Sequence, residues 1–218
     1  FPLKLDTLKV TDSAIVYGES VPGKNEIWKF HIDALIGDLV NVTSIPEFQK
    51  VFGHFGAKFT AKIEGNGSLI FDLRVPYSKD EFDMEIEFTG FPLPKINEIL
   101  NPIMNGDIVS GDLRRMNVKI HADSLKSVNQ FRFDYTDLKV ELFQKGTQKK
   151  NRFMSTLANI ALNSSNLPGD RRYMTASYTT SRNIYRGPFH LVWKSTKEGI
   201  MQIVPGGVAK EILNNSSD

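Results

Sequence analysis

The stretch AKFTAKIEGNGSLIFDLRVPYSKDEFDMEIEF, residues 57–88, decides the fold because apolar and polar side chains alternate along three successive runs. A period of two places neighbouring side chains on opposite faces of a β-strand, so each run has one apolar and one polar face. The turn Gly65-Asn66-Gly67 joins the first two runs, and Asn66-Gly67 predicts a tight hairpin because both residue types tolerate positive φ. The stretch therefore predicts antiparallel strands with one solvated face.

The same alternation extends from this stretch in both directions. Towards the N-terminus it covers residues 28–36, preceded by runs at 3–10 and 14–17 that we interpret as another hairpin pair. Towards the C-terminus it covers residues 116–122, 131–135 and 138–142. The apolar positions change there from odd to even numbers at Thr136-Asp137. This change predicts a β-bulge, because one extra residue moves every later side chain to the other face.

Four segments have apolar side chains three and four residues apart, which is typical of helices. They are residues 44–55, 92–104, 148–163 and 188–204, and Ser44 is the expected N-cap of the first. We therefore expect a mainly β fold with a few helices (α+β), in which a curved antiparallel sheet forms an apolar groove with capping helices. Residues 1–145 would form the antiparallel β-groove with two inserted short helices. Residues 146–218 would form a basic, mainly helical C-terminal cap with one strand.

Charge is distributed unevenly along the chain, although the net charge of its 218 residues is only +2. Residues 145–194 hold nine Lys and Arg residues against one acidic residue, Asp170. Such a segment indicates an anionic partner or, alternatively, a solvated basic surface without one. The candidates for contact with anionic head groups or another anionic partner are Lys149, Lys150, Arg152, Arg171, Arg172, Arg182, Arg186 and Lys194.

The sequence lacks the motifs of enzymes and of metal sites. It has no Cys, and its histidines are not spaced like metal ligands: His31, His54, His121 and His190. It has no Gly-rich phosphate-binding loop and no G-x-S-x-G motif. The acidic positions of residues 81–87 are spaced like a glycosidase carboxylate pair, but they alternate with apolar residues as on a solvated sheet face. We expect no catalytic residue, no metal and no cofactor, with a hydrolase on this strand as a weaker alternative.

Large apolar side chains are concentrated at the alternating positions, and in a continuous sheet they would line one face. The candidates for this apolar groove are Trp28, Phe30, Ile32, Phe59, Ile63, Leu69, Phe71, Leu73, Phe82, Met84, Ile86, Phe88, Val118, Ile120, Phe131, Phe133 and Tyr135. Either the helices of the chain or a bound acyl chain must cover such a face. A self-packed two-layer core is the simpler of these two expectations.

Residues 94–143, PKINEILNPIMNGDIVSGDLRRMNVKIHADSLKSVNQFRFDYTDLKVELF, bear on this choice. A helix ending in Asn101-Pro102, a strand start at Ser110-Gly111-Asp112-Leu113 and a return strand closing on Tyr135-Thr136-Asp137-Leu138 follow one another. This order, together with Arg186-Gly187, Trp193-Lys194 and Gly199-Ile200, resembles the C-terminal region of the AsmA-like family of bacterial envelope proteins, within the bridge-like lipid-transport superfamily. The resemblance covers about half of the chain.

The resemblance implies a curved sheet with an apolar concave face, in proteins of outer-membrane biogenesis that pass phospholipid between membranes. We therefore expect a non-enzymatic lipid-binding or lipid-transport domain of the Gram-negative periplasm or cell envelope. Acyl chains would lie on the apolar face, with head groups near the basic segment. Its partners would be phospholipids or other acyl-chain lipids, and also a membrane surface or envelope proteins, but not nucleic acid. The alternative is a structural or protein-interaction module with a self-packed core. The chain starts at Phe1 without an initiator Met, so we expect an N-terminal anchor helix outside it.

Overall fold

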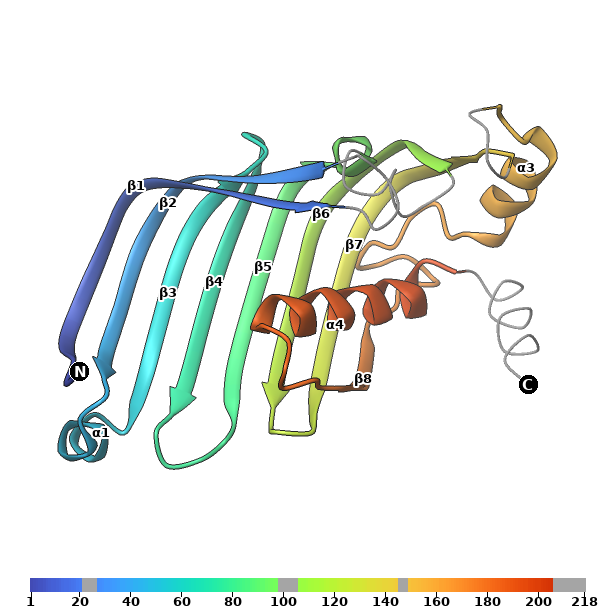
Figure 1. Ribbon diagram of the computed structural model, residues 1–218. Coiled ribbons are helices and arrows are strands. Elements are labelled where there is room, and N and C mark those ends of the chain that lie inside the picture. Colours follow the sequence, from blue (N-terminus) through green and yellow to red (C-terminus); the bar gives the residue numbers. More distant parts are fainter. Residues whose placement is uncertain (21–26, 98–105, 145–148, 206–218) are drawn as a thin grey trace.

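The computed structural model describes residues 1–20, 27–97, 106–144 and 149–205 (Figure 1). Eight strands form one antiparallel sheet in the order β1 to β8, and each strand pairs with the next along the chain. The strands are β1 (Lys4–Ser20), β2 (Ile27–Thr43), β3 (His54–Ile63), β4 (Gly67–Pro76), β5 (Phe82–Pro92), β6 (Gly106–Ala122), β7 (Lys126–Leu142) and β8 (Ala176–Ser181). The expected class, mainly β with a few helices, is confirmed. The sheet is open and uncurled, and its first and last strands do not pair with each other.

The hairpin at the centre of the opening stretch is confirmed, but its turn residues differ from those expected. Glu64 (φ 49°) and Gly65 (φ 65°) have the positive φ angles, in place of Asn66 and Gly67. The backbone N–H of Asn66 donates to the carbonyl of Ile63 at 2.9 Å and closes the turn. Gly67 already belongs to β4, where it pairs with Ile63.

The bulge expected at Thr136-Asp137 is confirmed. Asp112 pairs with Thr136 and Ser110 pairs with Lys139, so β7 contains one extra residue between these pairs. The extra residue is Asp137, which has a φ of 55°. The Ser110-Gly111-Asp112-Leu113 segment, expected to start a strand, instead lies inside β6, because a register shift lets the strand continue through it.

The first two strands differ most from the expectation. Residues 3–17 do not form a hairpin, because β1 is one strand of seventeen residues that pairs along its whole length with β2. The interval between the runs 3–10 and 14–17, which we interpreted as the turn of a hairpin, instead holds an irregularity at Asp12 (φ 45°), opposite another at Ala34 (φ 49°). Figure 1 shows both strands bending and continuing past the end of β3.

The helices lie where helical spacing occurs in the sequence, with shorter bounds. They are α1 (Pro46–Phe52), the 3-10 helix η1 (Leu93–Ile96), α3 (Arg152–Ala161) and α4 (Pro188–Ile203). Ser44 is not the N-cap of α1; the N-cap position is Ile45, and the Ser44 hydroxyl accepts from the backbone N–H of Leu3 at 3.0 Å. Most of the helix expected at 92–104 lies outside the described residues.

The C-terminal region contributes both to the sheet and to its cover. Strand β8 pairs with the first part of β7, so the segment expected as a cap supplies the last strand of the same sheet. Helix α4 then returns over one face of the sheet and contacts β7 and β8 (Figure 1). The functional question is therefore how much of that face α4 and its neighbours cover.

Candidate functional site

One row of side chains crosses all eight strands and shows how the apolar face is arranged. Strand pairing aligns Val10, Gly37, Phe59, Phe71, Ile86, Val118, Phe131 and Ala176. Directly paired residues of neighbouring strands point to the same side of a sheet. From Ile86 onward the residues of this row are buried, whereas Phe59 and Phe71 are only half-buried. The apolar face is therefore continuous but unequally covered.

We call the apolar face of β5–β8 the closed half, because its side chains are buried and α4 packs on its last two strands, β7 and β8. Leu191, Ser195, Gly199 and Ile203 follow one another at intervals of four residues and form the buried stripe of this helix. A Cβ atom at Gly199 would lie 2.4 Å from the ring of Phe131, so only glycine permits this approach. The buried candidates on β5–β7 belong to the hydrophobic core, together with Ile63 at the end of β3: Phe82, Met84, Ile86, Val118, Ile120, Phe131, Phe133 and Tyr135.

A buried polar network fixes α4 to the closed half. Asn129 donates to the hydroxyl of Thr180 at 3.0 Å, and that hydroxyl donates to the carboxylate of Glu198. The hydroxyl of Ser195 donates to the Asn129 side-chain oxygen at 3.4 Å. The hydroxyl of Tyr178 donates to the carbonyl of Ser195 at 2.5 Å, and burial raises the pKa of this tyrosine. Because these groups would be unsatisfied without α4, the helix has a specific position rather than a sliding one.

The outer edge of β7 beyond β8 is also satisfied by the chain itself. The carboxamide of Asn159 accepts from the backbone N–H of Val140 at 2.9 Å and donates to its carbonyl at 2.8 Å. The hydroxyl of Ser155 accepts from the backbone N–H of Leu142 at 2.8 Å. Both side chains come from α3, and they form hydrogen bonds with β7 that a neighbouring strand would otherwise form. At the opposite edge, no strand of the described chain pairs with the outer side of β1.

We call the apolar face of β1–β4 the open half. Its most exposed side chains are on β1, where Leu8, Ile15 and Tyr17 retain 47%, 47% and 44% of their accessible surface. The candidates Phe30, Ile32, Phe59, Leu69, Phe71 and Leu73 are half-buried on this half, and Phe88 of β5 is half-buried at its border. Trp28 belongs to β2, but its side chain lies outside the described part of the chain.

The exposed residues of β1 were not among the groove candidates. Leu8 pairs with Leu39, Ile15 with Ile32 and Tyr17 with Phe30, so they extend the apolar face to the edge of the sheet. The apolar alternation of residues 3–17 could have identified them. Because it was interpreted as a separate hairpin, these residues were not assigned to the same face.

The opposite face of the sheet is polar, and the acidic positions of β5 lie on it beside partners from β6. The Asp83 carboxylate contacts His121 at 2.7 Å, and Glu85 lies 3.5 Å from Lys119. Glu87 forms an ion pair with Arg115. Each of these carboxylates thus faces a basic side chain across the strand pair, which is the arrangement of a stabilising charge ladder on a solvated face.

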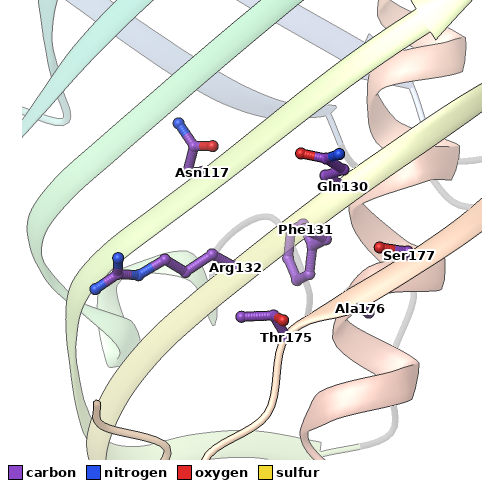
Figure 2. A pocket seen from close by; sticks show the side chains of 7 residues that line it. All are labelled: Asn117, Gln130, Phe131, Arg132, Thr175, Ala176 and Ser177. Atoms are coloured by element: carbon purple, nitrogen blue, oxygen red, sulfur yellow. The ribbon is translucent and has the colours of Figure 1, made fainter.

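Two shallow depressions lie on this polar face. Figure 2 shows one of about 240 Å³, where Asn117, Gln130 and Arg132 meet Thr175 and Ser177. A second, of about 470 Å³, is lined mostly by charged residues of β4–β6. Their amide, hydroxyl and charged groups do not suit an acyl chain. Neither depression therefore coincides with the apolar surface of the open half.

The basic candidates do not form one cluster. Lys150 pairs with Glu141 at 2.7 Å near the end of β7, whereas Arg182 donates to the carbonyl of Asp123 at 2.6 Å near its start. These two positions lie at opposite ends of the seventeen-residue strand β7. Lys149 and Arg152 adjoin Lys150, Arg171 and Arg172 lie in the connection to β8, and Arg186 and Lys194 lie beside and on α4. A single lipid head group could contact only a few of them.

Comparisons with known proteins add no identification, since no protein-family model, no curated protein and no solved structure matches the chain. Within the described residues, no helix has the length and apolar character needed to cross a bilayer. No group of three or more His, Asp or Glu side chains suited to a metal ion occurs in that part of the chain.

Proposed function

We propose that this chain is a non-enzymatic lipid-binding domain whose open half holds acyl chains. One observation carries the proposal: a continuous apolar face is buried over β5–β8, where α4 packs on β7 and β8, but keeps large, partly exposed side chains over β1–β4. Soluble domains rarely expose contiguous apolar surface without a partner for it. A cell-envelope location in a Gram-negative bacterium and a role in lipid transport belong to the same proposal and rest on the sequence resemblance.

Physical chemistry favours an acyl chain as the occupant of an apolar surface of this shape. Phe59 and Phe71 lie side by side with their ring centroids 6.4 Å apart, and Leu69 and Leu73 flank Phe71 along β4. A hydrocarbon chain lying on this surface would gain about 0.8 kcal/mol for each methylene removed from water. The surface offers this chain no reacting group, so binding alone would be its activity.

The basic segment has a different place in this proposal from the one expected from the sequence. Its residues lie near the β7–β8 end of the strand order, whereas the open half lies near the β1 end. They would therefore contact head groups of a lipid surface rather than the head group of the lipid on the open half.

Lipid extraction and native mass spectrometry of the purified chain test the proposal. We expect co-purifying phospholipid, and we expect the double variant Leu8→Asp/Ile15→Asp to retain about tenfold less, because charged groups would replace apolar contacts. The matched control is Val16→Asp/Ile36→Asp, which changes two exposed apolar residues of β1 and β2 that point to the other face. Lipid-free protein, or equal retention in both double variants, would contradict the proposal.

A protein-interaction module is the second candidate, favoured by the outer edge of β1, with which no other strand pairs in the described part of the chain. A long unpaired edge strand can add a strand from another chain, and proteins usually protect such edges. The edge of β7 is protected by α3, whereas β1 has no such cover among the described residues. This candidate accounts for the edge but not for the apolar surface of β2–β4, so we place it second.

A further inference from the structure

The solvent-facing stripe of α4 carries large apolar residues, although the packing of the helix on the sheet uses only its buried stripe. Trp193, Lys197 and Met201 follow one another at intervals of four residues, on the side of the helix opposite Leu191 and Ser195. Trp193 keeps 46% and Met201 keeps 48% of the accessible surface, and Lys197 is exposed. Helix α4 is thus apolar on its buried side and also displays large apolar side chains to solvent.

The turn that precedes α4 adds to this surface. Ile184 and Tyr185 are exposed, Tyr185 at 92% of its accessible surface. The side chain of Asn183 accepts from the backbone N–H of Tyr185 at 3.0 Å, and its carbonyl accepts from the N–H of Arg186 at 3.1 Å. The turn is therefore ordered while it presents two large apolar side chains to solvent.

The charge around these residues is positive. Arg186 and Lys197 are exposed, and neither forms an ion pair within the described chain. Residues 182–205 contain a single acidic residue, Glu198, and its carboxylate accepts a hydrogen bond from Thr180 at the buried side of α4. The outer surface therefore combines aromatic and aliphatic groups with unpaired cations.

We propose that the outer stripe of α4, with Ile184 and Tyr185, docks this domain onto an anionic phospholipid bilayer. Trp and Tyr rings are favoured at the boundary between hydrocarbon and water, and Lys and Arg can bury their stems while their charges remain at the head groups. Basic side chains next to an anionic leaflet add electrostatic attraction. This inference deepens the proposed function and rests on it for its biological purpose.

The position of α4 relates docking to lipid binding. The helix covers part of the apolar side of the sheet, and Figure 1 shows it in front of β6 and β7, with β4 and β3 to its left beyond β5. Its outer stripe therefore points away from the sheet on the same side as the open half. A bilayer that contacts α4 would lie opposite the surface proposed to take acyl chains.

Vesicle binding by the full chain tests the docking surface. We expect the chain to co-sediment with vesicles of phosphatidylglycerol and phosphatidylcholine, but about tenfold less with phosphatidylcholine alone or in high salt. The variant Trp193→Ser/Met201→Ser should lose binding about tenfold or more. The control variant Ile70→Ser/Val128→Ser changes two exposed apolar residues of the polar face and should bind like the parent.

Fluorescence gives a second readout at the site itself. The chain has two Trp residues, so the Trp28→Phe variant leaves Trp193 as the single reporter, and its emission should shift to shorter wavelength on anionic vesicles. No co-sedimentation, or equal co-sedimentation of the Trp193→Ser/Met201→Ser variant and the parent, would overturn the docking proposal. If vesicle binding fails while phospholipid still co-purifies, docking is refuted and the proposed function stands. Vesicle binding without co-purifying lipid supports docking and refutes lipid storage on the open half.

Discussion

The closed half and the open half are made by the same sequence pattern, yet only one of them is a core. Phe131 of β7 and Phe59 of β3 occupy the same cross-strand row, at alternating positions flanked by polar neighbours. Phe131 is buried beneath Gly199 of α4, whereas Phe59 has one aromatic neighbour, Phe71, and remains half-buried. Period-two alternation therefore specifies which face is apolar, but not what covers it.

The two halves also differ in how the edge of the sheet is satisfied. At the closed half, α3 satisfies the edge of β7 with side chains, and α4 is fixed by buried hydrogen bonds. At the open half, β1 is an edge strand whose outer side pairs with no strand among the described residues, and its side chains Leu8, Ile15 and Tyr17 are exposed. Helices α3 and α4 thus contact the closed half, whereas among the described helices only the short α1 contacts the open half, at β2. The other half has the properties of a binding surface.

The largest expected difference in the free energy of unfolding is between alanine variants of Phe131 and Phe59. Phe131→Ala removes a fully buried ring and should lower the free energy of unfolding by about 3–5 kcal/mol. Phe59→Ala removes a half-buried ring and should cost about 1–2 kcal/mol, because less surface returns to water. Urea unfolding of both variants measures the difference. Equal losses would mean that the open half is as well covered as the closed half, and this comparison would fail.

Helix α4 offers a second way to test the difference, with an intermediate effect. Gly199→Val places a side chain against the Phe131 ring and should cost about 1–3 kcal/mol through overpacking. Valine has a better helix propensity than glycine, so a loss of stability would report the clash and not the helix. Lys197→Val, on the outer stripe, should change stability by only about 0.5 kcal/mol.

Hydrogen exchange would locate the damage in the Gly199→Val variant. We expect faster exchange in α4 and β8, with β3 and β4 unchanged, because the clash lies at the contact of α4 with β7. Slow exchange throughout α4 would show that the helix tolerates a larger side chain there. That result would contradict the close packing on which the closed half depends.

Much of the sheet could be predicted from the sequence because strand parity is a local signal. The bulge at Asp137 follows from one change of parity, and the β3–β4 hairpin follows from two runs separated by a Gly-rich turn. At residues 3–17 the interpretation was wrong, because an irregularity within β1 at Asp12 separates two apolar runs in the same way as a turn between strands. Parity reports a register change but does not distinguish a bulge from the end of a strand.

The cover of the face could not be predicted, because it depends on contacts between distant segments. Nothing local to Phe131 or Phe59 indicates which of them lies beneath α4. A partial signal exists in β7, where Asn129 continues the apolar parity with a polar side chain. Buried polar residues at such positions require partners, and here Asn129 is bonded to Thr180 and Ser195. They indicate a polar cover, which an acyl chain would not provide.

The smallest expected change in stability concerns the turn between β6 and β7, in the closed half. Asp123, between β6 and β7, accepts hydrogen bonds from the backbone N–H groups of Leu125 at 2.7 Å and Lys126 at 2.8 Å. The bond from Lys126 and then that from Leu125 hold the pKa of this carboxyl below its ordinary value. Its carbonyl also accepts from Arg182, which leads from β8 into α4. In the open half, the β3–β4 turn is closed by backbone groups around Glu64 and Gly65.

Because the pKa of Asp123 is lower in the folded chain than in the unfolded chain, its contribution to stability is complete above the ordinary pKa of 3.8. The contribution is lost as the pH falls below that value through the folded pKa, where the carboxylate becomes protonated. Asp123→Asn keeps an acceptor oxygen but removes the titration, so it should be less stable than the parent at pH 7 and approach the parent at about pH 3. Urea unfolding at both pH values measures this convergence. A constant difference between parent and variant would show that the charge of Asp123 does not support the turn on which β8 and α4 depend.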